Sequence, residues 1–256
     1  MHRSETMTEV PQQRRPRRGS EMRVEHEPGF VLHSTAWRET SLILDVLTRA
    51  HGRMALVARG AKRPASQFRG LLNPFCPLAL SWSGRQEIKS LVRVEWLGGL
   101  APLRGDGLLA AFYVNELLVR LLARGDAHES LFDAYVEALG ALARDRARHV
   151  DVLRRFELTL LTATGHAPPL DHCVDGAAIE PAAWYRPEPQ RGLVRVEGLP
   201  DELAVRGSSL LALACGDLAD AEAAGQCKRL LRQLIRYHLE GRPLNTRRIF
   251  QDLKQL

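Results

Sequence analysis

Motifs that support catalysis are missing from this 256-residue sequence. It has no glycine-rich loop closed by Gly-Lys-Ser/Thr, no nucleophile elbow and no pair of metal ligands spaced for one helix face. An enzyme is therefore the least favoured class, and binding is the more economical interpretation. We expect no catalytic residue, no cofactor and no bound metal.

Cysteine and long apolar runs are also scarce. The four cysteines, Cys76, Cys173, Cys215 and Cys227, show no paired spacing, and no secretory signal precedes them. We expect reduced thiols in a cytoplasmic protein. No apolar run approaches the roughly 20 residues that a membrane helix requires, so we expect a soluble chain without a membrane partner.

Positive charge is abundant but unevenly distributed. Residues 30–96 hold ten Lys and Arg against four Asp and Glu, and residues 228–256 hold eight against two. The middle, 97–227, holds twelve against nineteen, so basic segments flank an acidic body. Local cation density favours a polyanion partner, because phosphate neutralisation depends on local and not net charge. The alternative is a solvated arginine-rich surface.

Between Phe30 and Trp96 the sequence is typical of a small barrel. Five short apolar runs, FVLHS, SLILDVL, GRMALVARG, LLNPFCPLALSW and QEIKSLVRVEW, are separated by Gly, Pro, Arg and Ser clusters. This predicts a five-stranded antiparallel OB-fold barrel over 29–97 that binds single strands. In the last run, a period of two places Ile88, Val92, Val94 and Trp96 in the core and Glu87, Lys89, Arg93 and Glu95 in solvent.

The barrel also carries the predicted DNA contacts. Nine cations are expected to follow the phosphates: Arg38, Arg53, Arg59, Lys62, Arg63, Arg69, Arg85, Lys89 and Arg93. Aromatic stacking partners are few, and most are expected in the core. Trp37 beside Arg38 and Phe68 beside Arg69 lie in predicted loops, so these two are the candidates for base contacts.

Helical patterns follow the predicted barrel, so we expect an α+β protein with several domains. We predict a disordered basic tail over residues 1–28 and a linker in the glycine-rich stretch 98–107. An all-helical domain spans 108–256, with helices near 108–123, 127–144, 150–164, 201–216 and 219–240 and a short one after Asn245 and Thr246. An irregular insert at about 165–200 contains a short hairpin near Gly192 to Val196. The C-terminal Arg and Lys cluster is a possible second DNA surface.

Two smaller groups of residues could each form a binding site, and each also has a plainer explanation. His166, His172 and Cys173 could bind zinc, but structural zinc needs four ligands, usually as two close pairs, so ordinary loop side chains are favoured. Arg154, Leu158 and Leu161 share one face of a helix, next to the core face formed by Leu153, Phe156 and Leu160. A cation beside an apolar strip suits an acidic, apolar peptide terminus. An arginine whose stem covers the core is the alternative.

Several segments resemble the RecO family of DNA repair and recombination proteins: GFVLHSTAWRETSLILDVLTRAHGRMALVARGAKRP, YVNELL, LRRFELTLL and the closing LEGRPLNTRRIFQDL. The resemblance implies an OB-fold, a helical domain and a recombination mediator without a chemical step. Such a protein binds single- and double-stranded DNA and anneals complementary strands. It engages DNA coated by single-stranded-DNA-binding protein (SSB), works with RecR to load RecA, and lies in the cytoplasm with the nucleoid.

By the same resemblance, Arg154, Arg155, Leu158 and Leu161 become the expected binding site for the acidic SSB tail. Many relatives carry a four-cysteine zinc module after the third bundle helix, but only Cys173 remains here. We therefore expect an insert without zinc, held by packing of Trp184 and Tyr185. Two rivals stay open. One is a protein adaptor that docks acidic partner tails and contacts DNA indirectly, and the other is an RNA-binding OB protein.

Overall fold

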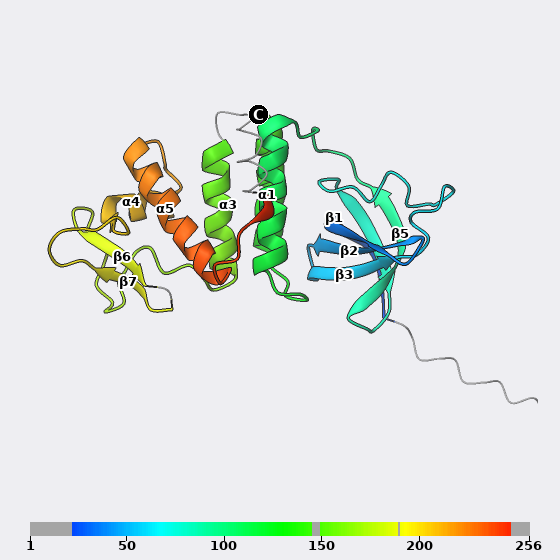
Figure 1. Cartoon of the computed structure of the whole chain (residues 1–256), viewed down its shortest axis with the longest axis horizontal. Helices are drawn as coiled ribbons and strands as arrows, with labels where there is room; N and C mark the ends of the chain where they lie inside the picture. Colours follow the sequence, from blue (N-terminus) through cyan, green and yellow to red (C-terminus); the bar gives the residue numbers. More distant parts are fainter. Residues whose placement is uncertain (1–21, 145–148, 189, 247–256) are drawn as a thin grey trace, which may run out of the picture.

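The computed structural model describes residues 22–144, 149–188 and 190–246. A closed β-barrel occupies one side of the molecule, and a helical part that includes a small second sheet occupies the other (Figure 1). The predicted α+β class, with an N-terminal barrel and a helical domain after it, is confirmed. The predicted disordered segment 1–21 and most of the predicted last helix lie outside the described residues.

Five strands build the barrel: β1 (Arg23–Trp37), β2 (Ser41–Thr48), β3 (Gly52–Ala58), β4 (Leu78–Ser83) and β5 (Ile88–Trp96). They close in the order β1-β2-β3-β5-β4. Leu44, Leu56, Leu80 and Trp82 fill the interior. The five-stranded barrel is as predicted, but it is not antiparallel throughout. Strands β3 and β5 run parallel where they pair. Parallel neighbours need a long crossover connection, and the chain between these two strands includes β4.

Strand β1 begins before the point that the sequence indicated. Residues 23–28, predicted as part of the disordered tail, pair with β4 through Arg23↔Ser83, Val24↔Trp82 and Glu27↔Leu80. The register shifts between Val24 and Glu27, where His26 takes a positive φ of 55°. This bulge breaks the alternation that marks a strand in sequence. The prediction of disorder for 23–28 is therefore wrong.

A second irregularity changes which side of β5 faces the core. The β4–β5 register shifts between Ser81 and Trp82, so Trp82 pairs with Leu91 while Ser81 pairs with Arg93. Leu91 and Val94 are consequently buried. Two residues predicted as core, Ile88 and Val92, are exposed instead, and so is Trp96, which ends the strand on the same side as Val94. A simple period of two cannot reveal such a bulge, because one extra residue inverts the pattern beyond it.

The helical part contains α1 (Gly105–Leu121), α2 (Glu129–Arg144), α3 (His149–Ala163), α4 (Gly207–Cys215) and α5 (Ala221–His238). Their apolar faces meet in one core that includes Leu117, Tyr135, Phe156 and Leu231. Helix α1 begins inside the predicted linker, after an irregular segment at 97–104. Helix α4 begins six residues later than predicted, because Val205 and Arg206 belong to a strand.

The insert contains a three-stranded antiparallel sheet of β6 (Trp184–Glu188), β7 (Gly192–Arg195) and β8 (Val205–Arg206), in the order β7-β6-β8. The predicted hairpin near Gly192 is confirmed, while β8 is too short to show a period. Tyr185 is fully buried, and its hydroxyl accepts a hydrogen bond from the Glu180 N–H at 2.8 Å. Trp184 is half-buried with the Arg206 guanidinium 5.9 Å from its ring.

The barrel packs directly on α1 and α2. Phe30 and Leu32 of β1 belong to the same apolar core as the helices, and Phe30 meets Tyr135 edge-on at 5.1 Å. Tyr135 donates a hydrogen bond to Asn115 Oδ1 at 2.7 Å, and Asn115 Nδ2 donates to the Leu32 carbonyl at 3.0 Å. Because all these groups are buried, the contact fixes the barrel against the helices.

Candidate nucleic-acid interface

A groove of about 1150 Å³ opens at one end of the barrel. It lies where three connections meet: the β1–β2 turn, the start of the loop after β3, and the β4–β5 turn. Its lining residues are Trp37, Arg38, Thr40, Ser41, Ile43, Val57, Arg59, Gly60, Arg63, Ser83, Gly84, Arg85, Gln86, Ile88 and Ser90. Four of them are arginines, and none of these lining residues is acidic.

Local backbone contacts hold these connections together. Arg38 has a positive φ of 54° in the β1–β2 turn, and Gly60 has one of 68° directly after β3. The Lys62 N–H donates to the Thr40 carbonyl at 2.9 Å, and the Gly60 N–H donates to Ser41 Oγ at 3.4 Å. The loop after β3 is thus tied to the β1–β2 turn, which brings the cations of both segments to the same edge.

The groove combines positive charge with an apolar floor. Arg38, Arg59 and Arg63 are exposed, and no acidic partner for them occurs among residues 22–144, 149–188 and 190–246. Trp37 is 45% exposed, and the Arg38 guanidinium lies 5.9 Å from its ring. Cations for phosphates beside an aromatic face for a base are the two components of a single-strand binding surface.

The other predicted DNA residues occupy varied places. Lys62 is exposed beside the groove, and Lys89 is half-buried on β5 between two groove residues. Arg69 is exposed, but its guanidinium donates to the Pro64 carbonyl at 3.0 Å. Arg93 is exposed and paired with Glu95. None of these four lines the groove.

Arg53 does not belong to this surface. Its side chain is only 12% exposed and pairs with Asp45 at 2.8 Å. It also donates to the Leu122 carbonyl at 2.9 Å, so it links β3 to the end of α1. The charge that suggested a phosphate contact is neutralised at the contact between barrel and helices. Arg53 is removed from the candidate set.

The two predicted base-stacking residues, Trp37 and Phe68, lie in different environments. Trp37 ends β1 at the groove, as a stacking residue should. Phe68 is buried in the barrel core against Leu72, so its predicted role in base contact is wrong. Trp96 is 66% exposed, although a period of two places it on the same side of β5 as the buried Val94, because it is the last residue of the strand.

The expected SSB-tail site is mostly inside the helical core. Arg154 is 11% exposed and pairs at 2.8 Å with Glu157, which is fully buried. Leu161 is also fully buried, and Leu158 is half-buried. Only Arg155 is exposed, and it donates to the Gly216 carbonyl at 3.3 Å. The spacing on the helix is as predicted, but the shared face points to the core.

The Arg154 pair forms part of a buried polar network. Tyr113 donates a hydrogen bond to Glu157 Oε1 at 2.6 Å, opposite the arginine. Burial raises the pKa of Glu157, although Arg154 and the Tyr113 hydroxyl act in the lowering direction. Arg154 therefore neutralises an acid inside the bundle, which is a structural role.

The three residues weighed for zinc are not brought together. His166 stacks on His238 with ring centroids 3.8 Å apart, and His172 pairs with Asp171 at 2.7 Å. Cys173 is buried, its backbone N–H donates to the Ala177 carbonyl, and burial raises the pKa of its thiol. Across the described ranges, no three His, Cys, Asp or Glu side chains form a group able to hold a metal.

Two family models match the chain. The model described as "Recombination protein O N terminal" matches residues 22–100, and "Recombination protein O C terminal" matches 103–248. The first boundary agrees with the start of β1 at Arg23.

In the part of the chain that the structure describes, no helix is both long and apolar enough to cross a membrane.

Curated relatives cover nearly the whole chain. A DNA repair protein RecO of Ralstonia nicotianae is 50% identical over 250 residues, covering 94% of this chain and 91% of the relative. The DNA repair protein RecO of Thiobacillus denitrificans is 48% identical, with 93% and 95% covered. That of Polynucleobacter asymbioticus is 48% identical, with 92% and 99% covered.

Proposed function

The chain belongs to the RecO family of DNA repair and recombination proteins and is not an enzyme, and on this premise we propose that it is a recombination mediator whose barrel groove binds single-stranded DNA. One observation carries the proposal. Exposed arginines from three connections line a groove without an acidic residue, beside the exposed ring of Trp37.

The groove suits an unpaired strand for two physical reasons. Arg38, Arg59 and Arg63 can neutralise successive phosphates, and each neutralised phosphate releases counterions into solution. Trp37 offers a face for one base, while Ile43, Val57 and Ile88 give the floor an apolar surface. Double-stranded DNA has phosphates but no free base faces, so it would use the cations alone and bind less tightly.

The finer activities of the mediator are part of the same proposal. The protein anneals complementary strands, acts on strands coated by SSB, and works with RecR to load RecA in the cytoplasm, at the nucleoid. The acidic SSB tail would meet Arg155 at the surface of α3, next to the half-buried Leu158. Arg154 and Leu161 support that surface from inside and do not contact the tail.

Binding of a labelled single strand by the full chain tests the proposal. The wild type is compared with Arg59→Glu/Lys62→Glu/Arg63→Glu (the groove variant) and with Arg104→Glu/Arg144→Glu, which reverses two exposed cations that do not line the groove. We expect the groove variant to bind at least tenfold more weakly and the control to bind nearly as the wild type. Equal binding by wild type and groove variant would remove the groove from the proposal.

Two further ligands separate the rival functions. A protein adaptor would bind an acidic SSB tail peptide while binding naked DNA only weakly, and the groove variant would lose no DNA affinity. An RNA-binding protein would prefer RNA over DNA of the same sequence. We expect DNA binding at least as tight as RNA binding, because the relatives that the chain matches are DNA repair proteins.

A further inference from the structure

Helix α5 carries a second set of cations, far from the barrel groove. Lys228, Arg229, Arg232 and Arg236 are all exposed. At 3.6 residues per turn they fall within about a third of the helix circumference. That face lies opposite Leu230, Leu231 and Leu234, which are buried. In Figure 1, α1 and α3 lie between α5 and the barrel.

Within the described ranges, two cations of α5, Arg229 and Arg236, are not compensated in the way that neighbouring charges are. In the adjacent insert, Arg186 pairs with Asp201, Arg191 with Glu188 and Arg195 with Glu180. Arg229 and Arg236 have no acidic partner among the described residues. Lys228 lies at the edge of the face, near enough to Glu157 to act on its pKa in the lowering direction. Uncompensated cations on one face favour a polyanion.

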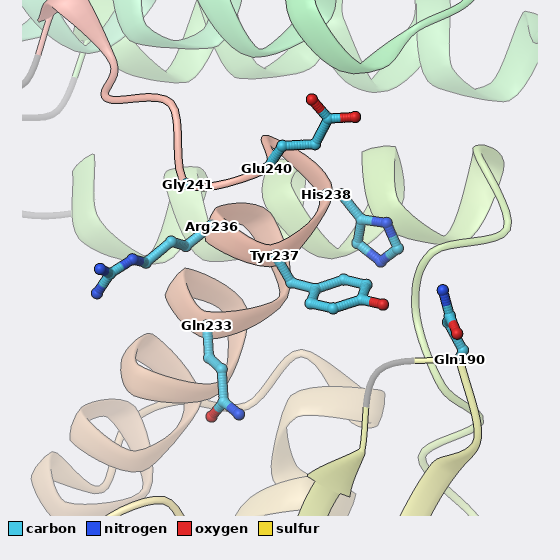
Figure 2. Close-up of a pocket in the computed structure, with 7 residues that line it drawn as sticks. All are labelled: Gln190, Gln233, Arg236, Tyr237, His238, Glu240 and Gly241. Atoms are coloured by element: carbon cyan, nitrogen blue, oxygen red, sulfur yellow. The ribbon is translucent and has the colours of Figure 1, made fainter.

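A pocket of about 700 Å³ adjoins this face at the C-terminal end of α5. Its lining residues are Gln190, Gln233, Arg236, Tyr237, His238, Glu240 and Gly241. Figure 2 shows the Tyr237 and His238 rings on the side that faces Gln190, which comes from the β6–β7 hairpin, while Arg236 points to the opposite side.

Ring contacts hold the aromatic side chains of the pocket, Tyr237 and His238, in place. Tyr237 is 42% exposed, and its ring meets His238 edge-on at 5.1 Å. His238 in turn stacks on His166 at 3.8 Å. Burial lowers the pKa of both histidines, which favours their neutral forms. One acid is present: Glu240 is exposed and pairs with Arg242 at 3.0 Å, which offsets its charge.

We propose that the basic face of α5 and the Tyr237 pocket together form a second site for an unpaired strand. Arg229, Arg232 and Arg236 contact phosphates, and one base stacks on Tyr237. The Gln190 and Gln233 amides each supply a donor and an acceptor, so they can bond to the edge of any base. A paired base cannot enter, because its edge is occupied by its partner.

This inference rests on the proposed function and deepens it. A protein that anneals complementary strands must hold two of them at once. The barrel groove and the α5 site lie on separate parts of a structure in which the barrel is fixed against the helices. Each site binds one strand through its backbone and one unpaired base, so the remaining bases stay free to pair.

The test uses the full chain in the background of the groove variant, so that residual binding reports on α5. Single-strand binding is measured at low salt after adding Arg229→Glu/Arg236→Glu, Tyr237→Ala or Tyr237→Phe. Arg104→Glu/Arg144→Glu serves as the matched charge control, and Arg229→Gln/Arg236→Gln serves as a milder version. Circular dichroism establishes that each variant is folded, as expected for exposed positions.

We expect the α5 charge reversal to weaken the residual binding at least tenfold and the charge control to leave it unchanged. Tyr237→Ala should weaken it about tenfold, the cost of one lost base–aromatic stack, while Tyr237→Phe should bind within about twofold because the ring remains. Duplex of the same length should be insensitive to Tyr237. Residual binding that all α5 substitutions leave unchanged would overturn the α5 site.

The two proposals fail in different ways. If the groove variant weakens binding but the α5 changes do nothing, the α5 site is refuted and the groove stands. If the α5 changes weaken binding in the wild-type background but the groove variant does not, the groove is refuted and the α5 site stands. If the wild type binds no DNA at any salt concentration, both are refuted.

Discussion

Replacing Arg154 by methionine should lower the Tm of the protein while leaving the proposed binding surfaces unchanged. Arg154 is the partner of the fully buried Glu157, at 2.8 Å. Methionine keeps much of the apolar stem but leaves the carboxylate with the Tyr113 hydroxyl and the charge of Lys228. Removing one partner of a buried ion pair typically costs about 3–5 kcal/mol. For a chain of this size each kcal/mol lowers Tm by about 2–4 °C.

The loss should depend on pH. Burial already raises the pKa of Glu157, and Arg154 is the largest influence in the opposite direction. Without Arg154 the pKa of Glu157 rises further. A carboxyl group with a raised pKa in the folded state destabilises the fold where it is ionised, and protonation relieves this as pH falls. The deficit of Arg154→Met should therefore be larger at pH 8 than at pH 5.

Thermal unfolding followed by circular dichroism at both pH values measures this deficit. Arg155→Met, on the exposed neighbour, is the matched control and should change stability by less than about 0.5 kcal/mol. Arg154→Met/Glu157→Leu removes both charges and should recover most of the loss, since a buried pair can be replaced by apolar groups at little cost. An Arg154→Met variant with unchanged Tm that no longer binds an SSB tail peptide would refute the structural role.

Three other substitutions give separate checks. Trp37→Ala should weaken single-strand binding about tenfold and leave duplex binding nearly unchanged, with Trp37→Phe as control; equal losses for both DNAs would contradict stacking. Burial acts to raise the pKa of Glu116, but hydrogen bonds from residues 245–246 hold that pKa below its usual range. The amides of residues 245–246 should therefore be protected from hydrogen exchange above pH 4.5 and lose protection below it. Glu116→Gln should remove this pH dependence. Gly52→Ala should lower the free energy of unfolding by at least about 1–3 kcal/mol, because φ is 65° and the new Cβ would lie 1.9 Å from the Asp126 carbonyl oxygen. An unchanged Tm would show that the segment around Asp126 moves away freely.

The fold was largely accessible from local patterns. The runs at Ser41–Thr48 and Gly52–Ala58 alternate and are rich in branched residues, and they form regular antiparallel strands. The exceptions are places where the ladder is irregular. At Val24–Glu27 and at Leu91–Arg93 a bulge inverts the alternation, so the sequence pattern indicates disorder for the first segment and the wrong inner face for the second.

The candidate site was accessible only in part. Arg38, Arg59 and Arg85 come from three separate connections, and the barrel closure brings them to one groove. Composition identified these cations but could not distinguish them from Arg53 and Arg154. These two arginines find Asp45 and Glu157 in the folded chain. Whether an arginine meets phosphate or a buried acid depends on tertiary contacts that no local spacing reveals.

The most direct measurement of the central claim is the salt dependence of single-strand binding by the wild type and the groove variant, Arg59→Glu/Lys62→Glu/Arg63→Glu. Each phosphate contact contributes about 0.7 to the slope of log affinity against log salt for single strands. We expect a steep slope for the wild type and one flatter by about 2 for the variant, if all three contacts are lost. A folded variant with the same affinity and the same slope would contradict it.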